Sequence, residues 1–122
     1  MEDEQESQIH RIEIDMETAK YDIKRADALS RLHSNADFKL IFLDDYFVQE
    51  ASRLVLLRAD PMVDNPRELK QIEDKITGIG VLRQHFGAVY QLGNMSQAAL
   101  REQELTREEL LEEQLSQDGT LQ

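Results

Sequence analysis

The chain has 122 residues, of which 32% are charged and 40% hydrophobic, and its formal net charge is −11. A chain of this length predicts one domain with a modest core. The absence of cysteine excludes disulfides, thiolate metal sites and cysteine nucleophiles, and the acidic charge disfavours binding to nucleic acid or to an anionic membrane. The apolar runs, such as residues 76–82, are also too short to span a bilayer.

Residues 3–33 contain neither glycine nor proline and are expected to form the first helix. One line of apolar residues recurs at alternating spacings of three and four, which is typical of a helix that lies along another helix: Ile9, Ile12, Met16, Ala19, Ile23 and Ala26. A second line recurs every seven residues on nearly the opposite face: Ile14, Tyr21 and Ala28. Two apolar stripes predict two neighbours for this helix.

Residues 35–59 are expected to form the second helix. Ser34 or Asn35 can cap its first turn, and it ends before Asp60-Pro61 because the residue before a proline disfavours the α conformation. Between Phe38 and Ala59, 14 of 22 residues are apolar. A helix that is apolar nearly all round is expected to be the buried centre of the fold.

Residues 66–117 are expected to form the third helix, beginning with the cap Asn65 and a proline at the first helical position. A kink or break is possible near residues 78–80 and 93–94, where glycines disfavour helix. We expect a continuous or gently kinked helix, because the apolar stripe keeps its phase. The small residues expected at close helix packing are Gly80, Gly87, Ala19 and Ala26. The glycines could also serve as a hinge that lets the arm after Gly93 swing toward a partner, and this role is compatible with close packing.

No motif of catalysis or cofactor binding is present. The three histidines, His10, His33 and His85, lack the spacing of a metal site. Asp44-Asp45 beside Tyr46 is the most suggestive polar cluster, either as a buried general acid or as ordinary polar surface that pairs with Lys39, Gln49 or an arginine. Adjacent helix positions point about 100° apart, so the two carboxylates are not expected to share a proton. We therefore expect no catalytic residue, no cofactor and no metal.

The three helices carry more apolar surface than a hairpin of unequal lengths can cover. Overhanging amphipathic ends usually pack against a second copy or another protein. The residues expected at such a partner interface are Ile14, Tyr21, Ala28, Leu100, Leu105, Leu110, Leu111 and Leu115.

Residues 29–100 resemble small acidic helical proteins of tailed bacteriophages that are encoded near virion morphogenesis genes. The resemblance lies in Asn35-Ala36-Asp37-Phe38, Asp44-Asp45-Tyr46-Phe47, Glu50-Ala51-Ser52-Arg53-Leu54, the segment from Ile79 to Phe86, and Gly93-Asn94-Met95 with Ala98. It implies a virion or virion-assembly protein that acts in repeated copies, with no catalytic residues, in the cytoplasm of an infected bacterium or in the virion.

These observations together predict an all-α fold, a three-helix hairpin or bundle with long first and third helices and coiled-coil-like ends. The expected function is non-enzymatic: oligomerisation, or docking on a capsid, portal or neck component, with itself or other virion proteins as partners and with neither nucleic acid nor membrane. One alternative is an acidic DNA-mimic inhibitor of a host or nuclease protein, which bases among the N-terminal acids disfavour. The other is a helical adaptor that binds one host protein through the arm from Gly93 to Leu115.

Overall fold

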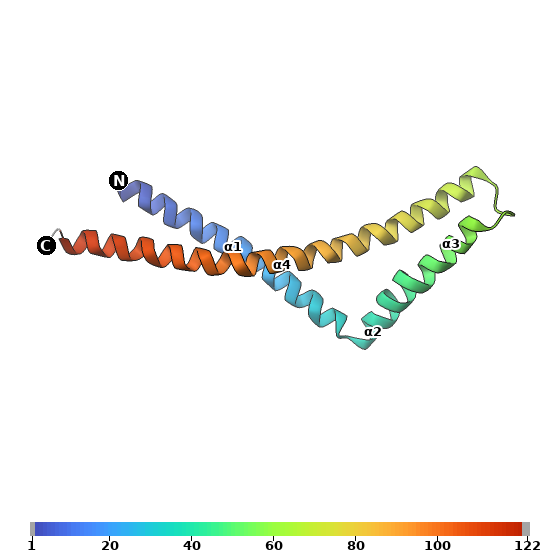
Figure 1. Ribbon diagram of the computed structural model, residues 1–122, viewed down its shortest axis with the longest axis horizontal. Coiled ribbons are helices and arrows are strands. Elements are labelled where there is room, and N and C mark those ends of the chain that lie inside the picture. The colour runs from blue at the N-terminus through green and yellow to red at the C-terminus, as the bar shows by residue number, and fades with distance from the viewer. Residues whose placement is uncertain (1, 121–122) are drawn as a thin grey trace. The chain divides into compact units, whose positions relative to one another are not determined.

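The computed structural model describes residues 2–120, and within them the fold is all-α, with no β-strand. The elements are α1 (Glu2–His33), α2 (Ala36–Phe38), η1 (Lys39–Glu50), α3 (Ala51–Ala59) and α4 (Pro66–Thr120). Because α2, η1 and α3 follow one another without a gap, they form one continuous helix, here called the middle helix. The prediction of three helices with a long first and a long last one is confirmed (Figure 1).

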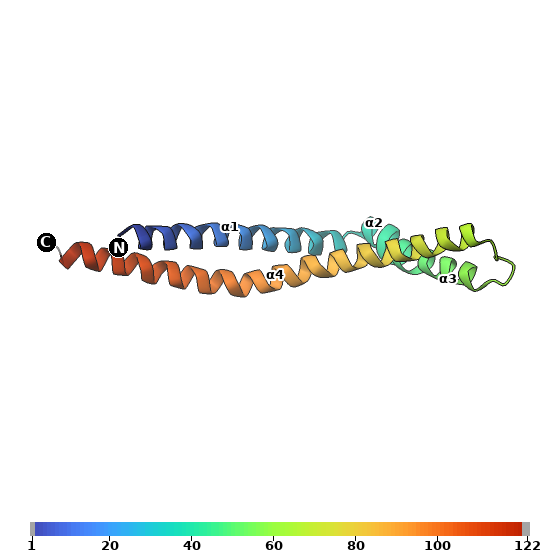
Figure 2. The ribbon, with the colours of Figure 1, turned by 90° about the horizontal axis from the view of Figure 1, so that it is seen from above.

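The contacts divide the chain into two compact units. The first unit consists of residues 1–27 and 91–122, and the second of residues 28–90. In the first unit the early part of α1 and the late part of α4 lie side by side in both views (Figures 1 and 2). In the second unit the middle helix is followed by a short turn and then by the first part of α4.

The starts of the helices follow from side-chain caps. The Oδ1 atom of Asn35 accepts hydrogen bonds from the backbone N–H groups of Asp37 and Phe38, both at 3.0 Å, so Asn35 is the cap of the middle helix. The Oδ1 atom of Asn65 accepts from the N–H groups of Arg67 and Glu68 at 2.9 and 3.3 Å. Each cap satisfies backbone donors that the first helical turn leaves without a partner.

The centre of the middle helix differs from an α-helix. Over Lys39–Glu50 the backbone forms a π-helix, in which each N–H bonds the carbonyl five residues earlier. The wider turn brings side chains four and five positions apart onto one face. The half-buried residues of this stretch and of the positions that flank it follow that spacing: Phe38, Phe42, Leu43, Tyr46, Phe47, Glu50 and Ala51.

The middle helix is not the buried centre that its composition predicted. Among its described residues only Leu54 is buried, with 1% of its surface exposed. Five large apolar side chains of the same helix are more than half exposed: Leu40, Ile41, Val48, Val55 and Leu56. The prediction was wrong because the described residues of the chain supply neighbours for one side of this helix only.

The last helix, α4, runs from Pro66 to Thr120 without a break at either glycine region. The prediction of close packing at Gly80 and Gly87 was wrong: a Cβ added at either position would meet no heavy atom of a described neighbour within 4 Å. Both residues lie on the exposed side of the helix. The close approach occurs instead at Gly93, where an added Cβ would collide with the Cβ of Ala26.

Candidate interaction surfaces

In the first unit, α1 and α4 run antiparallel in a single register. Gly93 lies against Ala26, the hydroxyl of Ser96 donates to Oδ2 of Asp22 at 3.0 Å, and Nε of Arg107 lies 3.3 Å from Oε1 of Glu13. From Ala26 to Glu13 the numbering falls by 13, while from Gly93 to Arg107 it rises by 14. The two helices therefore stay level with each other over several turns.

The face of α1 that packs in this pair is apolar, as predicted. Met16 and Ala19 are buried, and Ile9, Ile12, Ile23 and Ala26 are half-buried. The facing side of α4 is more polar, and one line of its buried and half-buried residues repeats at the same three- and four-residue spacing: Gly93, Ser96, Leu100, Gln103, Arg107, Leu110 and Gln114. Small residues at one end allow close approach, and polar residues hold the other end.

Within the described residues, two polar atoms of this contact are buried without a hydrogen bond: Oε1 of Gln103 and Nε of Arg107. The Arg107 guanidinium still forms its ion pair with Glu13, at a geometry outside that of a hydrogen bond. A buried polar atom without a hydrogen bond costs about 1–3 kcal/mol. The intramolecular pairing of α1 with α4 is therefore imperfect at this end.

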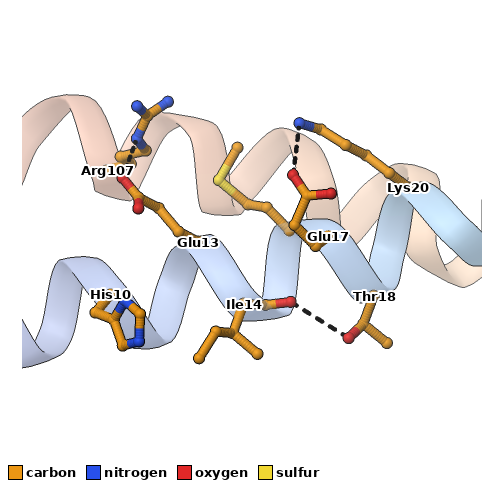
Figure 3. Close-up of a pocket in the computed structure, with 8 residues that line it drawn as sticks. His10, Glu13, Ile14, Glu17, Thr18, Lys20 and Arg107 are labelled. Carbon is orange, nitrogen blue, oxygen red and sulfur yellow. Dashed lines mark hydrogen bonds and ion pairs between the residues drawn. The ribbon is translucent and has the colours of Figure 1, made fainter.

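A hollow of about 570 Å³ lies beside α1 near this ion pair. Figure 3 shows Glu13 reaching toward Arg107 of α4, whereas His10, Ile14 and Thr18 lie on the other side of α1. Lys20 pairs with Glu17 at 3.4 Å along the same helix. A second hollow lies on the side of α1 that carries His10 and Ile14, and it is lined by Glu6, Ser7, His10, Arg11 and Ile14.

The residues predicted at a partner interface fall into two groups. Five are exposed: Ile14, Tyr21, Leu105, Leu111 and Leu115. The other three, Ala28, Leu100 and Leu110, are half-buried. Leu100 and Leu110 share the face of α4 that carries Ser96 and Arg107, the side that meets Asp22 and Glu13 of α1. Their role at a partner interface stays a prediction.

The second unit contains an aromatic cluster around Phe86 of α4. The Phe86 ring lies 6.0 Å from the rings of His33 and Phe38 and 5.8 Å from that of Phe47. Nδ1 of His33 forms a short hydrogen bond with the hydroxyl of Tyr90. A hollow of about 360 Å³ adjoins the cluster. Aromatic pairs of this geometry add about 0.5–1.5 kcal/mol each beyond burial, so the cluster joins α1, the middle helix and α4 within the unit.

The turn between the middle helix and α4 is held by one ion pair and by its own backbone. Nε of Arg58 lies 2.8 Å from Oε1 of Glu73, which ties α3 to the start of α4. The carboxylate of Asp60 accepts a hydrogen bond from the N–H of Met62 at 2.9 Å. The helix ends at Ala59 as predicted, since Asp60 is extended before Pro61.

The polar cluster that the sequence singled out is ordinary exposed surface. Asp44 and Asp45 are both exposed, and among residues 2–120 neither forms an ion pair with Lys39 or an arginine. Further along the same helix, the pKa of the Glu50 carboxyl is lowered, chiefly by the hydrogen bond from the Arg53 guanidinium.

The described part of the chain holds no group of three histidine, aspartate or glutamate side chains placed to hold a metal ion. In the same part, no helix combines the length and apolar character that crossing a bilayer requires. The polar groups that the sequence did not single out are Asp22, Ser96 and the His33–Tyr90 pair. For Asp22 and Ser96, the position in the sequence could have indicated a contact between helices. Ser96 is three residues after Gly93, and Asp22 directly precedes Ile23 of the predicted apolar line.

Comparisons with protein-family models, with curated proteins and with solved structures find no match to this chain.

Proposed function

We propose that this chain is a non-enzymatic assembly protein that acts by packing its helices against further copies of itself and against other proteins of a bacteriophage particle. The observation that carries the proposal is the exposure of apolar side chains. Fifteen large apolar residues are exposed in the described residues, whereas only six apolar residues are buried. Single exposed apolar residues are common on monomers, but here they recur along every helix.

The exposed area supports the same proposal. The chain has 9466 Å² of accessible surface, whereas a folded monomer of 14.2 kDa exposes roughly 6,800 Å². A specific protein–protein interface buries about 1,600 Å² in total. The excess of roughly 2,700 Å² is therefore enough for contacts with more than one neighbour.

The resemblance of residues 29–100 to helical proteins of tailed bacteriophages is the basis for naming a virion, in particular a capsid, portal or neck component, as the site of assembly. Proteins of such particles act in many copies, and repeated copies cover each other's exposed helices. In this proposal the polar, acidic end of α4 keeps the free chain in solution until it docks.

The molar mass in solution tests the proposal directly. We expect light scattering after size-exclusion chromatography to give multiples of 14.2 kDa that increase with protein concentration. A single mass of 14.2 kDa at two concentrations, or salt-sensitive binding of a monomer to a nuclease, would overturn it in favour of a different class of protein.

The exposed apolar residues of the middle helix provide a second test. Leu40→Glu with Leu56→Glu should weaken association, because both leucines are more than 60% exposed and a charge at an apolar contact is costly to desolvate. Gln49→Glu with Ser52→Glu adds the same charge to exposed polar positions of the same helix and should leave the mass unchanged. Equal masses for the two double variants would count against a role of this helix in assembly.

A further inference from the structure

The outer sides of the two helices of the first unit carry opposite charge. The outer side of α1, opposite the face that packs on α4, consists of exposed or half-exposed residues and is here called the α1 outer face: His10, Arg11, Ile14, Glu17, Thr18, Tyr21, Lys24 and Arg25. It holds three basic residues and one acid, a net charge of +2 with histidine neutral. Figure 3 shows three of its members, His10, Ile14 and Thr18, directed away from α4.

The corresponding side of α4 is acidic. The α4 outer face consists of exposed residues: Asn94, Met95, Ala98, Arg101, Glu102, Leu105, Glu108, Glu109, Glu112 and Leu115. Four acids and one base give it a net charge of −3. No ion pair within the described residues involves any of these five charged groups, nor Arg11 or Lys24 of the α1 outer face.

Both outer faces also carry apolar residues at one matching spacing. Ile14 and Tyr21 are seven residues apart on α1, and Ala98 and Leu105 are seven apart on α4. All four are exposed, Tyr21 by 60% and Leu105 by 57%. Two parallel helices laid with Ile14 beside Ala98 would therefore bring Tyr21 beside Leu105, because two helices of equal rise keep the same residue offset.

The same alignment matches the charges. With an offset of 84 residues throughout, Glu17 comes level with Arg101, Lys24 with Glu108, and Arg25 with Glu109. Each level at which both residues are charged is thus a pair of opposite sign.

The hollow on the α1 outer face suits the same alignment. Arg11, which borders the hollow formed with Glu6, Ser7, His10 and Ile14, comes level with Met95. The Met95 side chain is 60% exposed, and an unbranched thioether adapts to irregular spaces. Within one chain α1 and α4 are antiparallel and use their other faces, so this parallel contact requires a second molecule.

We infer that the α1 outer face of one copy of this chain binds the α4 outer face of a second copy, with the two helices parallel. The inference deepens the proposed assembly function and rests on it. Because the two faces differ, each copy binds one neighbour through its α1 outer face and another neighbour through its α4 outer face. Such a head-to-tail contact builds rings or open arrays and does not stop at a dimer.

Charge reversal on adjacent residues tests the contact. Lys24→Glu with Arg25→Glu makes both outer faces acidic, and Glu108→Lys with Glu109→Lys makes both basic. Each double variant should associate on the order of tenfold more weakly than the wild type, as measured by sedimentation equilibrium, because attraction becomes repulsion at two levels. The control is Asp44→Lys with Asp45→Lys, which changes two adjacent exposed acids and gives the same net charge of −7 as the Glu108/Glu109 variant, starting from −11.

Complementation then separates this contact from any other. Mixing the two weakened variants, or combining all four reversals in one chain, restores opposite charge across the contact and should restore association. Circular dichroism should show equal helicity for all variants. If the reversals leave the mass distribution unchanged, or if the combined chain does not recover, the contact is disproved while a multimeric wild type still supports assembly. A monomeric wild type would overturn both.

Discussion

Gly93 lies at a close approach of α4 to α1, and its replacement by alanine tests the packing of the first unit. Alanine favours helix over glycine by about 1 kcal/mol. At this position, however, the added methyl would collide with the Cβ of Ala26 and would lie 3.4 Å from the backbone carbonyl oxygen of Asp22. Neither atom belongs to a flexible side-chain end that could move aside. Overpacking of this kind costs about 1–3 kcal/mol.

The same substitution at Gly80 isolates the contact. Gly80 lies in the same helix, and a Cβ there would meet no described heavy atom within 4 Å, so Gly80→Ala should stabilise by up to about 1 kcal/mol. Gly93→Ala should therefore be about 1–3 kcal/mol less stable than Gly80→Ala. Thermal unfolding followed by circular dichroism, at one protein concentration for all variants, measures the difference as several °C in Tm.

A double substitution identifies the colliding atom. Ala26→Gly removes the opposing methyl, so Gly93→Ala in that background should stabilise as it does at Gly80. The reasoning is refuted if Gly93→Ala raises the Tm of the wild-type chain as much as Gly80→Ala does, since no close approach would then exist at Gly93.

Three further predictions concern the second unit. Leu54→Ala should lower the free energy of unfolding by about 2–5 kcal/mol in urea titrations, whereas Ser52→Ala, at an exposed site of the same helix, should change it by less than about 0.5 kcal/mol; equal losses would contradict the burial of Leu54. Asn35→Ala should destabilise by about 0.5–2 kcal/mol through loss of the cap, and Asn35→Asp should retain most of that stability. Arg53→Ala should raise the pKa of Glu50 toward its ordinary value, as followed by NMR titration of the carboxyl carbon, because the hydrogen bond that lowers it is lost. Because the pKa of Glu50 is lowered in the folded chain, the Glu50–Arg53 pair stabilises the fold fully at pH values above the ordinary glutamate pKa. That stabilisation is lost as the pH falls through the lowered pKa of Glu50. The Arg53→Ala variant should lack this pH dependence.

The helices and their starts were predictable from the sequence because they depend on neighbours along the chain. Asn35, Asn65 and Pro61 act on the backbone within four residues. The apolar line from Ile9 to Ala26 has the period of a helix, and its residues are buried or half-buried in the structure. A cap or a proline has the same local effect in any tertiary setting. The all-α class follows from the same local signals.

The contacts between helices were decided only by the tertiary structure. The glycines of α4 at positions 78, 80, 87 and 93 have the same local preferences, yet among these four only Gly93 meets a neighbour, because the register of the antiparallel pair places it opposite Ala26. Likewise, the composition of the middle helix indicated burial, but burial depends on how many neighbours surround a helix, and here they cover one side. Spacing along a chain specifies which residues share a face, whereas only the fold determines what that face meets.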